Sequence, residues 1–303
     1  MIFEFKYDYQ TMPKSQATTS GMKNVQGDLD NIRAEIDAVD VIYRRKNGEN
    51  LKIRLVYPDH LGRKEKYPLV FHIQGSAWFE QDLSSHILDF KEIVTTGYIL
   101  AIVEYLPLPE ATFPSQVEDA KCAMRYLEKH AEELRIDLDN IFLSGDSSGG
   151  HTALLCWATW NQNQLDVSTS QLPKIKGCID LYGVVDFLTI ADAVSGLDHD
   201  TDTSPVTLLL GGVIPKNNPK LAAKASVPYY LAEDKIYEPL LIIHGNKDTV
   251  VPFEQSVQLY QECKDKHIQA EFYCVNDADH GGSTFYCQAV LNIIVDFLKR
   301  HTD

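Results

Sequence analysis

The sequence predicts an α/β fold in which a mostly parallel sheet of about eight strands is flanked by helices. Short runs rich in β-branched residues alternate with longer helical patterns from residue 67 to residue 300. The length of 303 residues suits one domain of this class. An apolar fraction of 44% and a charged fraction of 23% are typical of a globular protein with a sizeable core.

The elements are expected in the following order. Residues 1–39 are polar and form an N-terminal arm, with a short helical pattern after Asp28, rather than a second domain. Alternating residues on both sides of Asn47-Gly48 predict an antiparallel hairpin of two edge strands. Further strands are expected at 67–73, 98–105, 140–145, 175–183, 239–245 and 270–275, with helices near 84–96, 115–134, 148–160, 253–266 and 285–300.

The alternation of strands and helices fails over about residues 186–238, where Gly211-Gly212, Pro215, Pro219 and Pro228 interrupt the pattern. We interpret this segment as a small inserted cap of short helices and loops. It would lie over the edge of the sheet formed by the carboxyl ends of the strands, where open α/β sheets bind ligands. The whole chain, 1–303, is therefore expected to be a single domain with an arm and an insertion.

The charge and cysteine patterns narrow the function classes. A formal net charge of −15 and a pI near 5.0 disfavour nucleic acid as a partner and mildly disfavour anionic substrates. No apolar run approaches the roughly 18 residues of a membrane span, and the N-terminus lacks a signal-peptide pattern. We expect no membrane association and a cytoplasmic location. The six cysteines lack CxxC spacing, which favours reduced structural thiols over a disulfide or metal site.

The string Gly145-Asp146-Ser147-Ser148-Gly149-Gly150 carries the clearest chemical signal. It directly follows a predicted strand and precedes an apolar helix, which is the context of a nucleophile elbow. Small residues two before and two after Ser147 permit the strained turn that exposes its hydroxyl. The sequence therefore predicts Ser147 as a catalytic nucleophile.

A nucleophilic serine needs a general base, and His280 is the candidate among ten histidines. It lies in a loop between the last predicted strand and the last helix, from which an imidazole can reach the elbow. His151 lies inside the predicted helix after the elbow, His244 ends a strand, and His72 lies within a strand. These three are interpreted as structural.

Asp248 is the candidate that orients the base, because it lies in a loop that leaves the penultimate strand at the same sheet edge. The chain order of serine, aspartate and histidine is the one found in α/β-hydrolases. Asp234, Asp277 and Glu254 are rival acids, each interpreted as lying on a solvated face.

An oxyanion hole is expected from the backbone amides of Ser148, Ser76 and Ala77. The last two belong to the loop after the third strand, Gln74-Gly75-Ser76-Ala77-Trp78. Without a catalytic role, this loop would be interpreted as a simple tight turn. Candidate substrate-binding residues in this region are Gly75, Trp78 and Phe79. The two aromatic side chains either line the acyl pocket or pack the loop down.

Over about residues 40–300 these segments resemble the hormone-sensitive-lipase-like and feruloyl-esterase-like branch of the α/β-hydrolase superfamily. The resemblance rests on the elbow, Phe113-Pro114, Leu210-Gly211-Gly212, Ser226-Val227-Pro228, the HGNKDTVVP string around Asp248, and His280-Gly281. It implies the α/β-hydrolase fold and carboxylesterase activity. That branch usually carries His-Gly-Gly-Gly-Trp where this chain has residues 74–78, and we infer a retained oxyanion hole with a tighter acyl side.

These observations predict a serine carboxylesterase that hydrolyses short acyl esters, such as acetyl groups on sugars or small aryl alcohols. The chemistry requires no metal or organic cofactor. A homo-oligomer is compatible with the sequence. Two alternatives stay open: a serine peptidase of the prolyl-oligopeptidase kind, which shares the triad order but needs a propeller for which this chain has no room, and a catalytically inactive binding protein.

Overall fold

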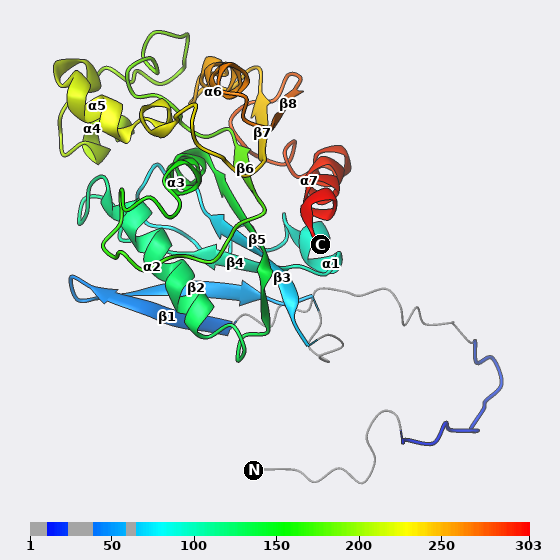
Figure 1. The fold of residues 1–303 in the computed structure, drawn as a ribbon. Coiled ribbons are helices and arrows are strands. Elements are labelled where there is room, and N and C mark those ends of the chain that lie inside the picture. Colours follow the sequence, from blue (N-terminus) through cyan, green and yellow to red (C-terminus); the bar gives the residue numbers. More distant parts are fainter. Residues whose placement is uncertain (1–10, 24–38, 59–64) are drawn as a thin grey trace. The chain divides into compact units, whose positions relative to one another are not determined.

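The computed structural model describes residues 11–23, 39–58 and 65–303 (Figure 1). The chain divides into two units, residues 1–31 and 32–303. In the first unit, the described segment 11–23 is exposed and contains turns but no helix or strand. The helical pattern expected after Asp28 lies outside the described residues.

The second unit is built on an eight-stranded sheet in the order β1-β2-β4-β3-β5-β6-β7-β8. The strands are β1 (Val39–Lys46), β2 (Glu49–Val56), β3 (Tyr67–Ile73), β4 (Ile99–Val103), β5 (Ile136–Asp146), β6 (Gly177–Leu181), β7 (Leu240–Gly245) and β8 (Ala270–Val275). Strand β2 pairs antiparallel with β1 and β4, and every other pair is parallel. This confirms the expected number of strands and the mostly parallel sheet.

The opening hairpin is confirmed, with Asn47 and Gly48 in left-handed conformations at its turn. The expectation of two edge strands is wrong for the second of them. Four residues of β2, from Ile53 to Val56, pair with β4, so β1 alone forms this edge of the sheet. Buried side chains on β2 are the physical reason, because an inner strand can bury residues that an edge strand would expose.

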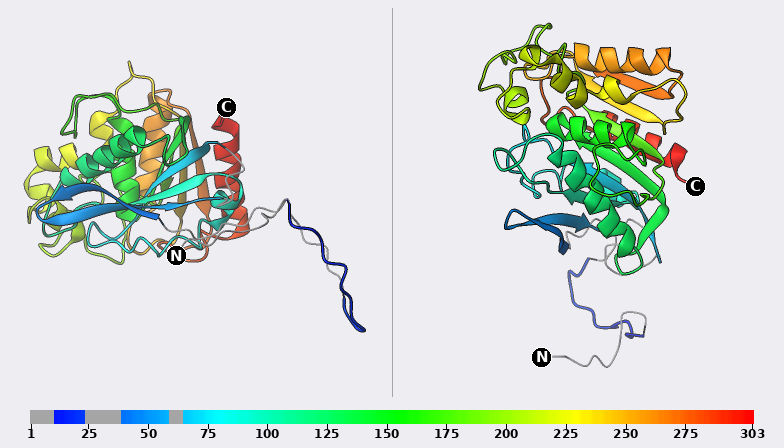
Figure 2. Two further views of the ribbon diagram at one scale, coloured as in Figure 1. Left: turned by 90° about the horizontal axis from the view of Figure 1, so that it is seen from below. Right: turned by 60° about the vertical axis from the view of Figure 1, so that its left-hand side comes forward.

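Helices cover both faces of the sheet (Figures 1 and 2). They are α1 (Lys91–Thr95), α2 (Ser115–Lys129), α3 (Ser147–Ala158), α6 (Glu254–Asp265) and α7 (Gln288–His301). The buried side chains of α2, α3 and α6 belong to one apolar cluster, and those of α1 and α7 to the other. The sheet therefore separates two cores, as expected when crossover helices lie on both faces of parallel strands.

The helix expected near 84–96 is shorter in the structure, where α1 spans only Lys91–Thr95. Residues before it form successive turns, such as the bond from the Ser85 amide to the Asp82 carbonyl. Two of these residues make tertiary contacts, since Ser85 accepts a hydrogen bond from Gln74 and His86 Nε2 lies 3.7 Å from Asp146. These tertiary contacts override the helical pattern.

The insertion between β6 and β7 contains only short elements. They are α4 (Pro205–Leu209), η1 (Pro215–Asn217), α5 (Pro219–Ala225) and η2 (Val227–Tyr230). The segment is tied to the loops that follow the strands, for example by bonds from the Val227 amide to Val185 and from the Gly196 amide to Thr249. It therefore packs beside the carboxyl ends of β6 and β7.

Within the described ranges, no helix is both long and apolar enough to cross a lipid bilayer. All six cysteines are free thiols, and Cys156, Cys178 and Cys263 are buried.

Candidate active site

Ser147 lies at the sharp turn between β5 and α3, with a backbone φ of 52°. The turn requires glycine on both sides. A Cβ at Gly145 would lie 2.2 Å from the Gly149 carbonyl oxygen, and a Cβ at Gly149 would lie 2.0 Å from that of Ile73. This is the strained strand-to-helix geometry that the motif predicts, and it presents the Ser147 hydroxyl at the carboxyl edge of the sheet.

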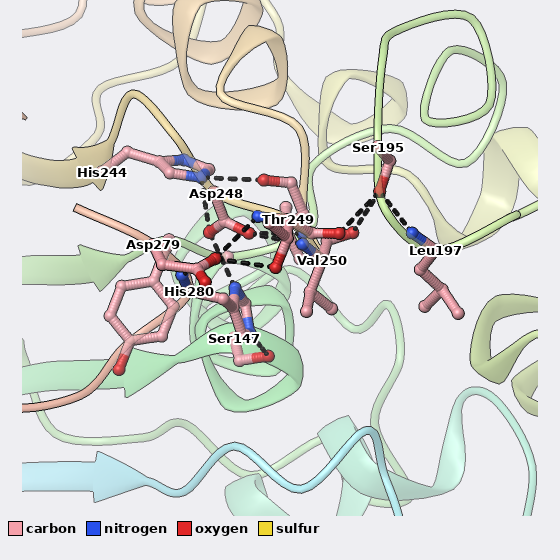
Figure 3. A network of polar contacts seen from close by, with 12 residues as sticks. Ser147, Ser195, Leu197, His244, Asp248, Thr249, Val250, Asp279 and His280 are labelled. Carbon is pink, nitrogen blue, oxygen red and sulfur yellow. Dashed lines mark hydrogen bonds and ion pairs between the residues drawn. The ribbon is translucent and has the colours of Figure 1, made fainter. Parts of the chain in front are cut away.

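The structure brings Ser147, His280 and Asp248 together (Figure 3). The Ser147 Oγ lies 2.8 Å from His280 Nε2, and His280 Nδ1 lies 2.7 Å from Asp248 Oδ2. The residues come from three separate places: the elbow, the loop after β7 and the loop after β8. A carboxylate can only accept, so His280 donates from Nδ1 and its Nε2 is free to accept the serine proton.

Asp248 is held by four hydrogen bonds. Its Oδ1 accepts from the amides of Val250 and Val251, each at 2.8 Å. Its Oδ2 accepts from His280 and, at 3.1 Å, from His244 Nε2. Burial raises the pKa of this carboxyl, but the bonds and charges of the two histidines outweigh it and hold the pKa below its usual range. Asp248 is therefore an anion at neutral pH.

His244 was expected to be structural, and its contacts confirm a supporting position. It is fully buried, and its Nδ1 lies 2.7 Å from the Ser256 hydroxyl. Its bond to Asp248 has no signal in the sequence, because it depends on how the loop 245–251 folds back over the end of β7.

Asp279, adjacent to His280, orders the two loops that meet at the site. Its Oδ1 accepts from the Thr249 amide at 2.9 Å, the Thr249 hydroxyl at 2.7 Å and the His280 amide at 2.7 Å. The three rival acids, Asp234, Asp277 and Glu254, are exposed, as expected.

The loop after β3 lies against the elbow through the Ser148 hydroxyl. Ser148 Oγ accepts from the Ser76 amide at 2.9 Å and from the Trp78 amide at 3.1 Å. The Ser76 amide is thus already committed, which differs from its expected role as an oxyanion donor. Among the described residues, the amides of Ala77 and Ser148 have no acceptor.

The remaining loop residues have distinct positions. The Gly75 amide donates to Asp146 Oδ1 at 2.8 Å. Trp78 is buried, with 2% exposure, and its ring packs against those of His151 and Phe187. Phe79 is 39% exposed. Trp78 thus packs the loop down, whereas Phe79 is exposed.

The sequence also matches a known protein family. Residues 56–263 match the model of the BD-FAE family, which covers more than half of the chain. The chain belongs to the BD-FAE family. Together with the observed sheet order, this membership confirms the α/β-hydrolase fold.

Two relatives in Mycobacterium tuberculosis are similar to this chain in sequence. "Probable carboxylic ester hydrolase LipM" of Mycobacterium tuberculosis is 27% identical over 216 residues, which cover 67% of this chain and 47% of LipM. "Esterase LipQ" of the same organism is 25% identical over 270 residues, or 86% of this chain and 61% of LipQ. The BD-FAE chain therefore spans less than two thirds of either relative.

A solved structure described as a truncated form of a carbohydrate esterase from gut microbiota has a TM-score of 0.76 with the BD-FAE chain. It is 23% identical, and the match covers 91% of this chain and 99% of that chain. This likeness concerns the fold.

A pocket of about 710 Å³ opens beside the Asp248 loop of the BD-FAE chain. It is lined by residues 194–196 of the insertion, by 246–249, 253 and 254 after β7, and by Asp277 and Asp279. Ser195 connects the insertion to the loop after β7, since its hydroxyl lies 3.2 Å and 3.1 Å from the carbonyl oxygens of Thr249 and Val250 (Figure 3). The pocket wall carries more acidic than basic groups.

One cluster within the described ranges has the donor set of a metal site. Atoms of His72, His86 and Asp146 lie within 4.8 Å of one another. Asp146 faces His72 Nε2 at 3.2 Å and His86 Nε2 at 3.7 Å while it accepts from the Gly75 amide. Burial raises the pKa of Asp146, but the two imidazoles and this amide have a larger, opposite effect. The pKa of Asp146 therefore lies below its usual value. The bond from the Gly75 amide links Asp146 of this cluster to the loop after β3.

Proposed function

We propose that this chain is a serine carboxylesterase that acts on short acyl esters. The observation that carries the proposal is the chain of contacts from Ser147 to His280 to Asp248, at 2.8 Å and 2.7 Å. These distances are those required for a base to take the serine proton while a carboxylate orients the base. Membership of the BD-FAE family and the names of the relatives support ester hydrolysis.

In the proposed reaction, Ser147 Oγ attacks the ester carbonyl carbon while His280 Nε2 takes the hydroxyl proton. The carbonyl oxygen becomes an oxyanion that accepts from the amides of Ala77 and Ser148. The tetrahedral intermediate collapses, His280 returns the proton to the leaving alcohol, and an acyl-serine is left. Water then attacks this acyl group, again with His280 as base, and releases the acid and free Ser147.

We expect the acyl side of the proposed site to be narrow. Ser76 and Ala77 carry side chains where the resembled branch has glycines. These residues favour small acyl groups such as acetyl. The carbohydrate esterase with the same fold supports sugars as one source of the alcohol portion, with small aryl alcohols as the other.

The nucleophile is tested by Ser147→Ala. We expect kcat for p-nitrophenyl acetate to fall by at least about 10⁴-fold, because the remaining groups cannot form the acyl-enzyme. Ser168→Ala, which removes a serine hydroxyl remote from the elbow, is the matched control and should retain full activity. Retained activity in purified Ser147→Ala would contradict the assignment.

Substrate class is tested with the wild-type protein. Rates are compared for acetyl, butyryl, octanoyl and feruloyl esters, together with a proline anilide. We expect acetyl esters to be hydrolysed at the highest rate. Faster turnover of the octanoyl ester would overturn the narrow acyl side, and faster turnover of the anilide would indicate a peptidase. Covalent labelling by a fluorophosphonate separates an active serine from an inactive binding protein.

A further inference from the structure

The loop after β3 adopts a conformation that its own residues disfavour. Ala77 and Trp78 have φ values of 52° and 62°, in the left-handed region that glycine adopts readily. A non-glycine residue is strained in this region because its Cβ comes too close to the backbone. Something outside the loop must therefore hold it in place.

The Ser148 side chain supplies that support. Its hydroxyl accepts from the Ser76 amide at 2.9 Å and from the Trp78 amide at 3.1 Å, on either side of Ala77. Ser148 is buried, with 2% exposure, so water does not compete for these bonds. With both neighbours held, the Ala77 amide is left without an acceptor among the described residues, as is the Ser148 amide.

The hydroxyl of the half-buried Ser76 strengthens the arrangement. Ser76 Oγ donates to the Phe79 carbonyl at 2.7 Å, and it therefore accepts from the Tyr105 hydroxyl 3.0 Å away. Burial raises the pKa of Tyr105 to about 12, although the adjacent Ser76 and Ser148 hydroxyls lower it. Tyr105 thus stays protonated and keeps its donor at neutral pH.

We infer that the Ser148 hydroxyl is a positioning residue for ester hydrolysis, because it holds the loop so that the Ala77 amide can meet the oxyanion. The inference rests on the proposed function. It separates two contributions of one residue: the backbone amide binds the oxyanion, and the side chain fixes the position of the other donor. It also explains how the site can do without the glycines of the resembled motif.

The test is Ser148→Ala, which keeps the backbone amide and removes only the hydroxyl. We expect kcat for p-nitrophenyl acetate to fall about 10- to 100-fold, because a misplaced donor stabilises the transition state less. We expect KM to change by less than about threefold, since the loss falls on the transition state. Thr152→Val, which removes another buried hydroxyl of α3 whose partner is the Ser148 carbonyl, is the control and should keep wild-type kcat.

Amide hydrogen exchange over residues 74–80 gives a readout that is independent of catalysis. Exchange should accelerate about tenfold in Ser148→Ala, as two amides lose their acceptor, and stay unchanged in Thr152→Val. Wild-type kcat or unchanged exchange in Ser148→Ala would overturn the inference. If the wild type neither hydrolyses esters nor reacts with a fluorophosphonate, the proposed function fails, and faster exchange would then support the loop-holding role alone while the catalytic part is overturned.

Discussion

Single residues of the site serve two partners at once. One carboxylate oxygen of Asp248 accepts hydrogen bonds from both His280 and His244. The Ser148 hydroxyl oxygen accepts hydrogen bonds from two backbone amides. An acceptor that is shared in this way restricts the movement of its own side chain and of both donors. A buried polar group that satisfies several donors is costly to change, because each donor then loses its partner.

The residue that limits the acyl side is expected to be Ala77. Its φ of 52° suits glycine, and Ala77→Gly would remove both the strain and a methyl group next to the proposed oxyanion position. We expect the ratio of octanoyl to acetyl hydrolysis, measured as kcat/KM, to rise about tenfold, as expected from a change of about one methylene in a pocket. An unchanged ratio would place the limit on acyl length elsewhere.

His151 makes the stability of the fold sensitive to acid. It is fully buried and donates from Nε2 to the Ala225 carbonyl at 2.7 Å, and burial lowers its pKa from 6.5 to about 4. Between these values the unfolded chain binds more protons than the folded one. Stability therefore falls as the pH drops from 6.5 toward 4, by about 2 kcal/mol at pH 5.

His151→Gln keeps a donor but cannot titrate, so it should lose this part of the acid sensitivity. Urea unfolding at pH 7.5 and pH 5 measures the effect as a difference between the two free energies of unfolding. We expect that difference to shrink by about 2 kcal/mol relative to the wild type. An equal difference in both proteins would show that His151 is protonated within the folded state.

At the scale of elements, the site depends on how closely α3 approaches the end of β3. A Cβ at Gly149 would lie 2.0 Å from the Ile73 carbonyl oxygen, which is backbone and cannot turn aside. The close approach brings the loop after β3 within hydrogen-bond reach of the first turn of α3. Helix packing thus positions the elbow and the oxyanion loop together.

Gly149→Ala should separate these two elements. We expect a loss of about 3 kcal/mol in the free energy of unfolding, together with a fall in esterase activity. Gly211→Ala is the comparison, because φ is 74° there but the nearest contact is a Thr112 methyl at 4.0 Å. Backbone strain alone should cost about 1–2 kcal/mol. Equal losses in the two variants would argue against the steric explanation.

At the scale of the whole molecule, the net charge of −15 creates a negative field. Such a field repels anionic substrates and is weakened by salt. We expect kcat/KM for an anionic acetyl ester such as 4-acetoxybenzoate to rise about two- to threefold between about 20 mM and about 300 mM sodium chloride. The value for neutral p-nitrophenyl acetate should stay constant, and an equal rise for both esters would exclude a charge effect.

The sequence by itself determined the sheet, the elbow and the candidates Ser147, His280 and Asp248, because periodicity and a strand-to-helix motif are local properties of the chain. The edge position of β1 alone, the shortened α1, the commitment of the Ser76 amide to Ser148 and the bond from His244 to Asp248 were decided only by the tertiary structure. Each depends on how separate parts of the chain fold against one another. Such contacts leave no periodic signal, whether the partners are 72 positions apart, as Ser76 and Ser148 are, or four, as His244 and Asp248 are, so they become visible only in the folded chain.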